Sequence, residues 1–336
     1  MSPLFALLGV AVVAGTLVDI LWSTLTFDGA GPLGRLLHPA GRVLSGAWAP
    51  GWVRENVTIV LLGAGIVMWT ALTWAGWTLI FCGSDRAVLV TPEKTPADLW
   101  GRAYYAGFAI TTLGVGDLVA GSAGWRVATV LAATHGFVTV SLLVAYLLAV
   151  VAAVHERRAI GASVGNLGPA PVELVGAAAT DGFAALNNRL AALTARLETA
   201  VQRTDAFPIL GHDREADRAE SFTLGVAALG ETALLLEHAV SEADRPPACV
   251  YAPLRRAVDR TIERLGERGH PKSDEVEPPP PPDFQDLSDR LARAGAAPNP
   301  AAPATYAEDP DVREFRRKLH AWVRRAGRDW QAVRDR

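Results

Sequence analysis

Three apolar runs in the first half of this 336-residue chain constrain its fold more than any other feature. They cover residues 3–22, Thr58–Cys82 and Trp125–His155, and the second holds no charged residue in its 25 positions. A membrane-crossing helix needs about 20 predominantly apolar residues, so each run is long enough to span a bilayer. Asp19 lies near the end of the first run, where we expect its carboxylate to reach the membrane surface.

The first run has two interpretations, a cleaved signal peptide or a retained helix. No basic residue precedes it, it is longer than a usual signal core, and no small-x-small cleavage pattern follows it. We therefore expect residues 1–25 to form a first membrane helix.

Charge is distributed very unevenly along the chain. Residues 1–155 carry 14 of the 67 charged side chains, and the remainder of the chain carries the other 53. A membrane half is therefore followed by a soluble half, and the predicted fold class is all-α. Cys82 and Cys249 stand far apart, so no disulfide framework is implied. The near-neutral balance without a basic block argues against nucleic acid as a partner.

The flanks of the spans predict their orientation, because basic residues mark the cytoplasmic side. The third span ends in Glu156-Arg157-Arg158, and residues 26–57, a predicted interfacial loop, contain three arginines: Arg35, Arg42 and Arg54. Both flanks place the amino terminus outside and the soluble half in the cytoplasm. The expected location is a bacterial-type plasma membrane, crossed several times.

A short helix is predicted between the second and third spans. Thr95 is the expected N-cap, Pro96 the first helical residue and Asp98 the partner in a capping box. This helix would end near Ile110 and is too short to cross a bilayer. Its carboxyl end would carry a partial negative charge.

Directly after this helix the chain reads Thr111-Thr112-Leu113-Gly114-Val115-Gly116-Asp117. Rings of backbone carbonyls from several subunits can replace the hydration shell of a cation. Glycines at alternate positions permit the positive φ values that such aligned carbonyls require. Thr112 would add a ring of hydroxyls at the inner end, and Asp117 would place negative charge at the outer mouth.

Residues 58–158 resemble the outer helix, pore helix, selectivity filter and inner helix of the potassium channel family. The family's filter usually reads Thr-Val-Gly-Tyr-Gly-Asp after a further Thr, and this chain matches both threonines, both glycines and the aspartate. The resemblance implies that potassium is coordinated by Thr112, Leu113, Gly114, Val115 and Gly116. It implies that Thr111, Tyr104 and Tyr105 support the filter. Because the chain holds one filter motif, it also implies a homotetramer in a lipid bilayer.

Two positions depart from the family's pattern. Val115 lacks the hydroxyl by which the usual tyrosine is tethered, and Phe108 stands where some members place a carboxylate behind the filter. These departures motivate a second hypothesis, a poorly selective cation channel. A third hypothesis, from another class, is a non-conducting membrane sensor or scaffold whose helical soluble half is the working part.

Two neighbouring residues in the third span each have two interpretations. Gly136 falls where the family often has an inner-helix hinge, but a small residue there also serves close helix packing. His135 is a candidate pH sensor. The alternative for His135 is a neutral ring bonded to a neighbouring helix. Val140, Val144 and Leu147 or Leu148 are candidates to line the pore below them.

Residues 159–277 are predicted to form a helical cytoplasmic domain. An apolar repeat at alternating three and four positions is typical of a coiled-coil seam, and it comprises Phe183, Leu186, Leu190, Leu193, Leu197 and Ala200. This seam either joins four chains or packs within the domain. Phe222–Val240 carries Glu231, which favours a buried core helix over a fourth span.

The last part of the chain is divided by its prolines. Residues 278–307 are predicted to be a Pro/Ala-rich linker region, in which Pro278–Pro282 is stiff. Residues 308–336 are predicted to be an amphipathic helix that lies on anionic lipid or docks on its own domain.

Enzymatic chemistry is not expected. Residues 161–165 match Gly-x-Ser-x-Gly by letters, but a nucleophile elbow needs a preceding strand, and none is predicted. No phosphate-cradling loop or metal-spaced cluster occurs. No cofactor is expected beyond permeating potassium ions, and the ligand or partner of the helical domain is unknown.

Overall fold

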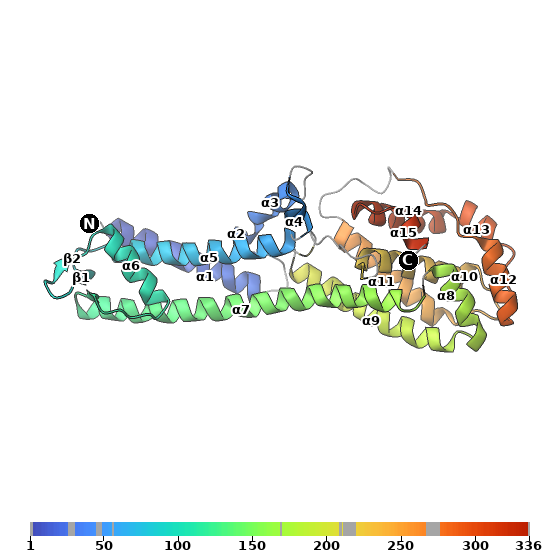
Figure 1. The fold of residues 1–336 in the computed structure, drawn as a ribbon, viewed down its shortest axis with the longest axis horizontal. Coiled ribbons are helices and arrows are strands. Elements are labelled where there is room, and N and C mark those ends of the chain that lie inside the picture. The colour runs from blue at the N-terminus through green and yellow to red at the C-terminus, as the bar shows by residue number, and fades with distance from the viewer. Residues whose placement is uncertain are drawn as a thin grey trace. The chain divides into compact units, whose positions relative to one another are not determined.

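The computed structural model describes residues 3–25, 31–44, 49–55, 57–168, 170–207, 210, 220–266 and 276–334. Parts of the predicted interfacial loop 26–57 and of the predicted domain 159–277 therefore lie outside the described residues. The chain divides into two compact units, which are described separately (Figure 1). The membrane unit comprises residues 1–151 and 206–212, and the helical unit comprises residues 152–205 and 213–336.

Three helices are long and apolar enough to cross a membrane, as the sequence predicts. They are α1 (Pro3–Leu25), α5 (Val57–Phe81) and α7 (Ala123–Gly165). Helix α7 continues ten residues past the predicted end at His155. The region between α1 and α5 contains the short helices α2 (Pro32–Arg35), α3 (Leu37–Leu44) and α4 (Gly51–Glu55).

Glycines allow α1 and α5 to approach each other closely. A Cβ atom added to Gly9 would lie 2.6 Å from the carbonyl oxygen of Gly76, and one added to Gly83 would lie 2.6 Å from Cβ of Ala6. Small residues are the usual means of close helix packing in a membrane, where apolar surface alone does not drive association. Helix α1 is therefore a packed part of the membrane unit.

The Asp19 carboxylate is buried among helices, which corrects the expectation that it extends outward at the end of the first span. The residue is only 2% exposed. Its Oδ2 accepts a hydrogen bond from Trp69 Nε1 at 2.8 Å, and its Oδ1 accepts one from the backbone N–H of Leu33, also at 2.8 Å. A buried carboxylate needs such donors, and these two bring α5 and α2 to α1.

The segment 83–97, between the second span and the short helix, contributes two strands of a small antiparallel sheet. The strands are β1 (Val88–Val90), β2 (Thr95–Pro96) and β3 (Leu118–Ala120), in the order β2-β1-β3. Leu89 pairs with Pro96 on one side and with Val119 on the other. The predicted N-cap at Thr95 is therefore wrong, since Thr95 belongs to a strand.

The helical unit buries its apolar residues within one chain. Its helices are α8 (Pro171–Ala178), α9 (Ala184–Ala206), α10 (Phe222–His238), α11 (Ala248–Gly266), α12 (Phe284–Ala294), α13 (Ala302–Glu308), α14 (Pro310–Arg325) and α15 (Gln331–Arg334), with a 3-10 turn at Ala179–Asp181. Helix α10 lies in the core, as predicted. The predicted seam is buried in the same core, with Leu190 and Leu197 at 0% exposure. This outcome favours packing within the domain over a bundle of four chains.

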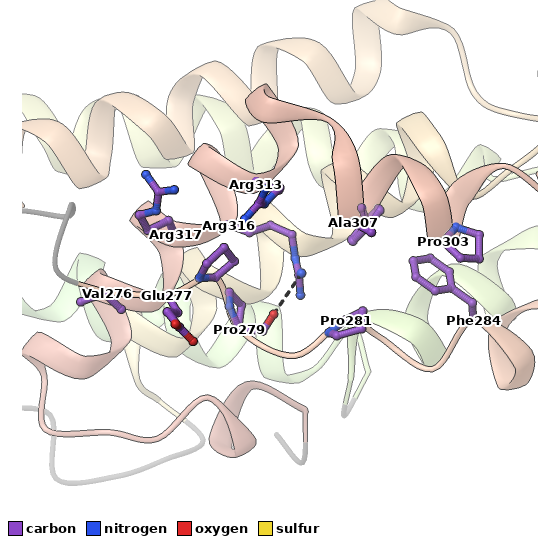
Figure 2. A pocket seen from close by; sticks show the side chains of 12 residues that line it. Val276, Glu277, Pro279, Pro281, Phe284, Pro303, Ala307, Arg313, Arg316 and Arg317 are labelled. Atoms are coloured by element: carbon purple, nitrogen blue, oxygen red, sulfur yellow. Dashed lines mark hydrogen bonds between the residues drawn. The ribbon is translucent and has the colours of Figure 1, made fainter.

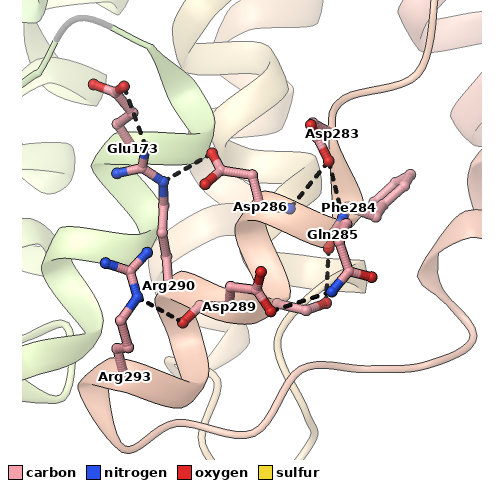
Figure 3. Close-up of polar contacts among 9 residues, drawn as sticks. Glu173, Asp283, Phe284, Gln285, Asp286, Asp289, Arg290 and Arg293 are labelled. Atoms are coloured by element: carbon pink, nitrogen blue, oxygen red, sulfur yellow. Dashed lines mark hydrogen bonds and ion pairs between the residues drawn. The ribbon is translucent and has the colours of Figure 1, made fainter.

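The predicted linker 278–307 is largely folded, which corrects its interpretation from composition. Asp283 caps α12 by accepting the backbone N–H groups of Gln285 and Asp286 (Figure 3). Arg290 on the same helix donates to Asp286 and lies 3.4 Å from Glu173 of α8. The Pro/Ala composition concealed these helices because their capping and core contacts, not their propensity, stabilise them.

A proline-rich strap, residues 276–282, belongs to no helix or strand and packs against the unit. Prolines offer only carbonyl groups for hydrogen bonding. Arg316 of α14 donates to the carbonyls of Pro279 at 3.1 Å and Pro280 at 2.8 Å, and its Nε lies 3.2 Å from Glu231 Oε2. Arg316 and Glu231 are 2% and 4% exposed, so they form a buried ion pair.

The predicted single helix over residues 308–336 is wrong, because two helices, α14 and α15, occupy this range, and α14 docks on its own domain. The apolar residues of α14 repeat at helical spacing, and they are buried: Val312, Phe315, Leu319 and Trp322. Trp330, beyond the helix, is 4% exposed. The core of the helical unit covers this face. The structure therefore contradicts the alternative in which the apolar face lies on lipid.

Candidate functional site

Helix α6 (Leu99–Ile110) is the short helix between the second and third spans, and it ends at the predicted residue. Asp98 is its N-cap, with Oδ1 accepting the backbone N–H of Gly101 at 2.7 Å. Trp74 of α5 donates its indole N–H to the carbonyl of Ala103 at 2.7 Å. The helix is therefore held at its start and along one side.

Arg102 holds the start of α6 against the end of α5, and it is 2% exposed. Its Nε donates to the carbonyl of Ala97 at 2.8 Å. Its Nη1 donates to the carbonyls of Phe81 at 3.0 Å and Ser84 at 2.8 Å. The guanidinium also lies 3.5 Å from Asp85. A buried guanidinium with this many acceptors fixes one orientation of α6 relative to α5.

The backbone after α6 has positive φ at alternate residues, as the motif predicts for its two glycines. The φ angles of Thr112, Gly114 and Gly116 are 59°, 58° and 91°. Glycine tolerates such values, whereas a β-branched threonine adopts them only under constraint. At Thr112 that constraint includes hydrogen bonds from its own N–H to Ala109 and from the next N–H, of Leu113, to Phe108.

The carbonyl groups of residues 111–116 accept no hydrogen bond from any described residue. Exposed carbonyls can bond to water, but at membrane depth, where water does not reach them, a row of unpaired carbonyls would need another partner. All seven residues of the motif are exposed in the single chain, with Leu113 at 68% and Val115 at 53%. The arrangement is suited to a cation that passes along the carbonyls.

The two ends of the motif are anchored differently. At its start, the Thr111 hydroxyl donates to the carbonyl of Gly107 at 2.8 Å. At its end, the carbonyl of Asp117 accepts the N–H of Thr91 at 3.0 Å, and β3 follows at once. The Asp117 side chain is exposed.

The two predicted support tyrosines lie in different surroundings. Tyr105 is 3% exposed and packs edge-on against Phe81 and Phe108. Its hydroxyl lies 2.7 Å from the Thr129 hydroxyl of α7, so it links the three helices α5, α6 and α7. Tyr104 is 43% exposed and contacts Phe108. Tyr105 thus supports α6 from within the chain, whereas Tyr104 does not.

Gly136 packs against the carboxyl end of α6. A Cβ atom at this position would lie 2.0 Å from the carbonyl oxygen of Ile110, and α7 continues through it as a helix. The geometry thus favours close packing over a hinge. Beside it, His135 accepts a hydrogen bond at Nδ1 from Trp77 Nε1 at 2.9 Å, as in the interpretation of a neutral ring bonded to a neighbouring helix.

Further along α7, one face carries exposed apolar residues. Val140, Val144 and Leu148 are 60%, 50% and 63% exposed. Leu147 is only partly exposed, so Leu148 is the residue of the predicted pair that continues this face.

Sequence reasoning missed Arg102 and the tryptophan contacts. A lone arginine in an apolar segment predicts a surface position more often than a buried clamp, and nothing in its spacing points to Phe81. The Gly-x-Ser-x-Gly letters have no catalytic geometry, because Ser163 lies inside α7 and donates to the carbonyl of Ala159.

Comparisons with known proteins agree with this geometry. An "Uncharacterized membrane protein YdjJ" of Bacillus subtilis (strain 168) is 29% identical over 294 residues, which cover 85% of each chain. No solved structure matches the chain. Residues 57–153 match the family model described as "Ion channel", which points to transport rather than enzymatic activity. This part of the chain is similar to the pore domain of ion channels.

Proposed function

We propose that the chain is a subunit of a homotetrameric, potassium-selective channel that conducts ions passively. The carbonyl groups of Thr112, Leu113, Gly114 and Val115 line the pathway, Gly116 completes the turn, and Asp117 lies at its outer mouth. The observation that carries the proposal is the alternation of positive φ at residues 112, 114 and 116 beside carbonyls that accept no hydrogen bond from a described residue.

Symmetry supports four copies. One chain supplies one strand of carbonyls, which covers only part of a cation's coordination shell. The exposed apolar face of α7, which includes Val140 and Val144, would line the pathway inside the ring. The charge pattern at the span ends supports a plasma membrane location with the amino terminus outside and the helical unit in the cytoplasm.

A poorly selective cation channel is the second candidate, and Val115 is the observation that favours it. The side chain is 53% exposed and has no hydroxyl with which to tether the motif to α6. A less tethered backbone adapts more easily to cations of different size, which would lower discrimination between potassium and sodium.

Flux from liposomes holding purified protein tests both candidates. Gly114→Asp should abolish flux, because φ of +58° strains any L side chain. Gly124→Asp is the matched control: this glycine has open space around it in the first turn of α7, where an acidic side chain is favourable.

Flux that prefers potassium, is lost in Gly114→Asp and persists in Gly124→Asp would support the first candidate. Comparable sodium flux with the same sensitivity to Gly114→Asp would support the second. Flux that is equal in the two aspartate variants would contradict both, since the pathway would then bypass the motif.

A further inference from the structure

The helical unit contains a pocket that the pore does not account for. Its volume is about 700 Å³, within the range of roughly 300–1,000 Å³ that small-molecule sites occupy. It lies between the proline-rich strap and helices α12, α13 and α14 (Figure 2). All of its lining residues belong to the helical unit.

One end of the pocket is positively charged. Arg313 and Arg317 of α14 are four residues apart, which places them on the same face of the helix. Figure 2 shows both on the side of the pocket opposite the strap. Arg317 also pairs with Glu314, whereas the side chain of Arg313 is exposed. Paired guanidinium groups suit a phosphate or carboxylate group, which they bind with two parallel hydrogen bonds.

The third arginine of the pocket, Arg316, already has hydrogen-bond partners within the helical unit. Arg316 donates to Glu231 and to two carbonyls of the strap, and its guanidinium lies 5.0 Å from the centre of the Tyr306 ring. It therefore shapes the wall and leaves anion binding to Arg313 and Arg317. Among the described residues, Glu277 is the one carboxylate in the lining, and it opposes an anion.

The other end of the pocket is apolar. Phe284 is partly buried and packs edge-on against Tyr306, with ring centroids 5.0 Å apart. Pro281, Pro303 and Ala307 continue this wall (Figure 2). Flat apolar rings and proline rings offer a surface on which a planar ring can stack.

We propose that this pocket binds a small organic anion with a planar ring, the chemistry of a nucleoside monophosphate. The phosphate lies between Arg313 and Arg317, and the base packs against Phe284 and Pro303. A divalent cation fits the lining poorly, because its charges are mainly positive. Among the described residues, no three His, Cys, Asp or Glu side chains gather to hold a metal.

Calorimetric binding to the full chain in nanodiscs tests the proposal with three probes. AMP carries both the ring and the phosphate, adenosine carries only the ring, and ribose 5-phosphate lacks the base. AMP should bind at least about tenfold more tightly than either fragment, since tenfold corresponds to one charged hydrogen bond. Equal binding of AMP and ribose 5-phosphate would overturn the role of the ring.

Substitutions should move AMP affinity in opposite directions. Arg313→Gln with Arg317→Gln should weaken AMP binding at least about tenfold, and Glu277→Gln should strengthen it by a few-fold. Phe284→Leu should weaken AMP and adenosine but leave ribose 5-phosphate unchanged. The matched control is Arg324→Gln, an exposed arginine of the same helix outside the pocket.

Thermal melting of each variant distinguishes a lost site from a lost fold. AMP binding that is unchanged in a folded Arg313→Gln/Arg317→Gln variant would overturn the proposal. So would the absence of saturable AMP binding at millimolar concentrations to folded parent protein. Binding is measured without ion flux, so either result leaves the proposed channel function standing.

Discussion

The membrane unit exposes many of its large apolar side chains, whereas the helical unit buries them. Every strongly exposed large apolar side chain among the described residues lies at or before Val151, in the membrane unit. In the helical unit, by contrast, the seam on α9 and the apolar face of α14 are buried in one core. The row of free carbonyls at residues 111–116 also belongs to the membrane unit.

This difference indicates what each unit needs. The exposed apolar surface of the membrane unit suits contact with lipid, and its carbonyls at residues 111–116 accept no hydrogen bond from the residues that the structure describes. The helical unit has its core already and contains a buried ion pair whose partners both come from the same chain. Substitutions in the two units should therefore have different consequences.

The largest expected effect is in the helical unit, at the buried pair. Arg316→Met leaves Glu231 buried without its cation, and breaking such a pair costs about 3–5 kcal/mol. We expect a lower melting temperature for the full chain in nanodiscs. The double variant Arg316→Met/Glu231→Met should recover most of the loss, because no unpaired charge remains.

Arg324→Gln again serves as the control, since this arginine is exposed in the last turn of α14. If Arg316→Met and the control have equal melting temperatures, the stability of the helical unit does not depend on its buried ion pair. The stated difference between the two units would then be wrong.

The next effect is at Gly136 in the membrane unit. Gly136→Ala places a methyl group 2.0 Å from the carbonyl oxygen of Ile110, and overpacking typically costs about 1–3 kcal/mol. We expect a lower melting temperature together with reduced flux. Gly63→Ala on α5 is the matched control, because nothing lies within 4 Å of the added methyl group.

The same pair of variants separates the two interpretations of Gly136. A hinge predicts altered opening with an unchanged melting temperature, whereas close packing predicts a loss of stability. An unchanged melting temperature in Gly136→Ala would therefore favour the hinge interpretation over close packing.

A smaller effect is expected at Arg102. Arg102→Lys keeps the charge but loses the planar guanidinium that donates to the carbonyls of Ala97, Phe81 and Ser84. We expect this to lower the free energy of unfolding by about 1–2 kcal/mol. Because α6 carries the motif, the ratio of potassium to sodium flux should fall as well. Arg126→Lys, at an exposed arginine near the start of α7, should leave the ratio unchanged; an equal fall in both would remove Arg102 as a positioning residue.

The smallest effect concerns pH and His238 at the end of α10. Burial lowers the pKa of His238 below its usual value, against the opposing influence of Glu237. The unfolded chain then binds the proton more readily than the folded chain, so stability is lost as pH falls below about 6.5. The melting temperature should decrease over this range, and less steeply in His238→Gln; an identical slope would exclude the contribution of this group.

The spans and the motif were predictable because each is encoded locally. An apolar run can be recognised without knowing what it packs against. Gly114 and Gly116 lack a side chain, which by itself indicates positive φ. The positive φ of Thr112 was not predictable in the same way, because it depends on hydrogen bonds to α6.

Features that depend on distant contacts escaped prediction. Asp19 is buried because Trp69, fifty residues away, donates to it, and Arg102 is buried because the end of α5 supplies acceptors. Likewise α12 and α13 form inside a Pro/Ala-rich segment because Asp283 caps the first helix and the core receives Tyr306 of the second. Composition reports the average tendency of a segment, whereas these contacts are specific pairs.

The number of chains in the particle tests the central claim most directly, namely that several copies complete the pathway around residues 111–116. Native mass spectrometry of the protein released from nanodiscs measures it without a gating stimulus or a ligand. The account predicts four chains. A stable monomer or dimer would contradict it, because the carbonyl groups of one or two chains cannot enclose a cation.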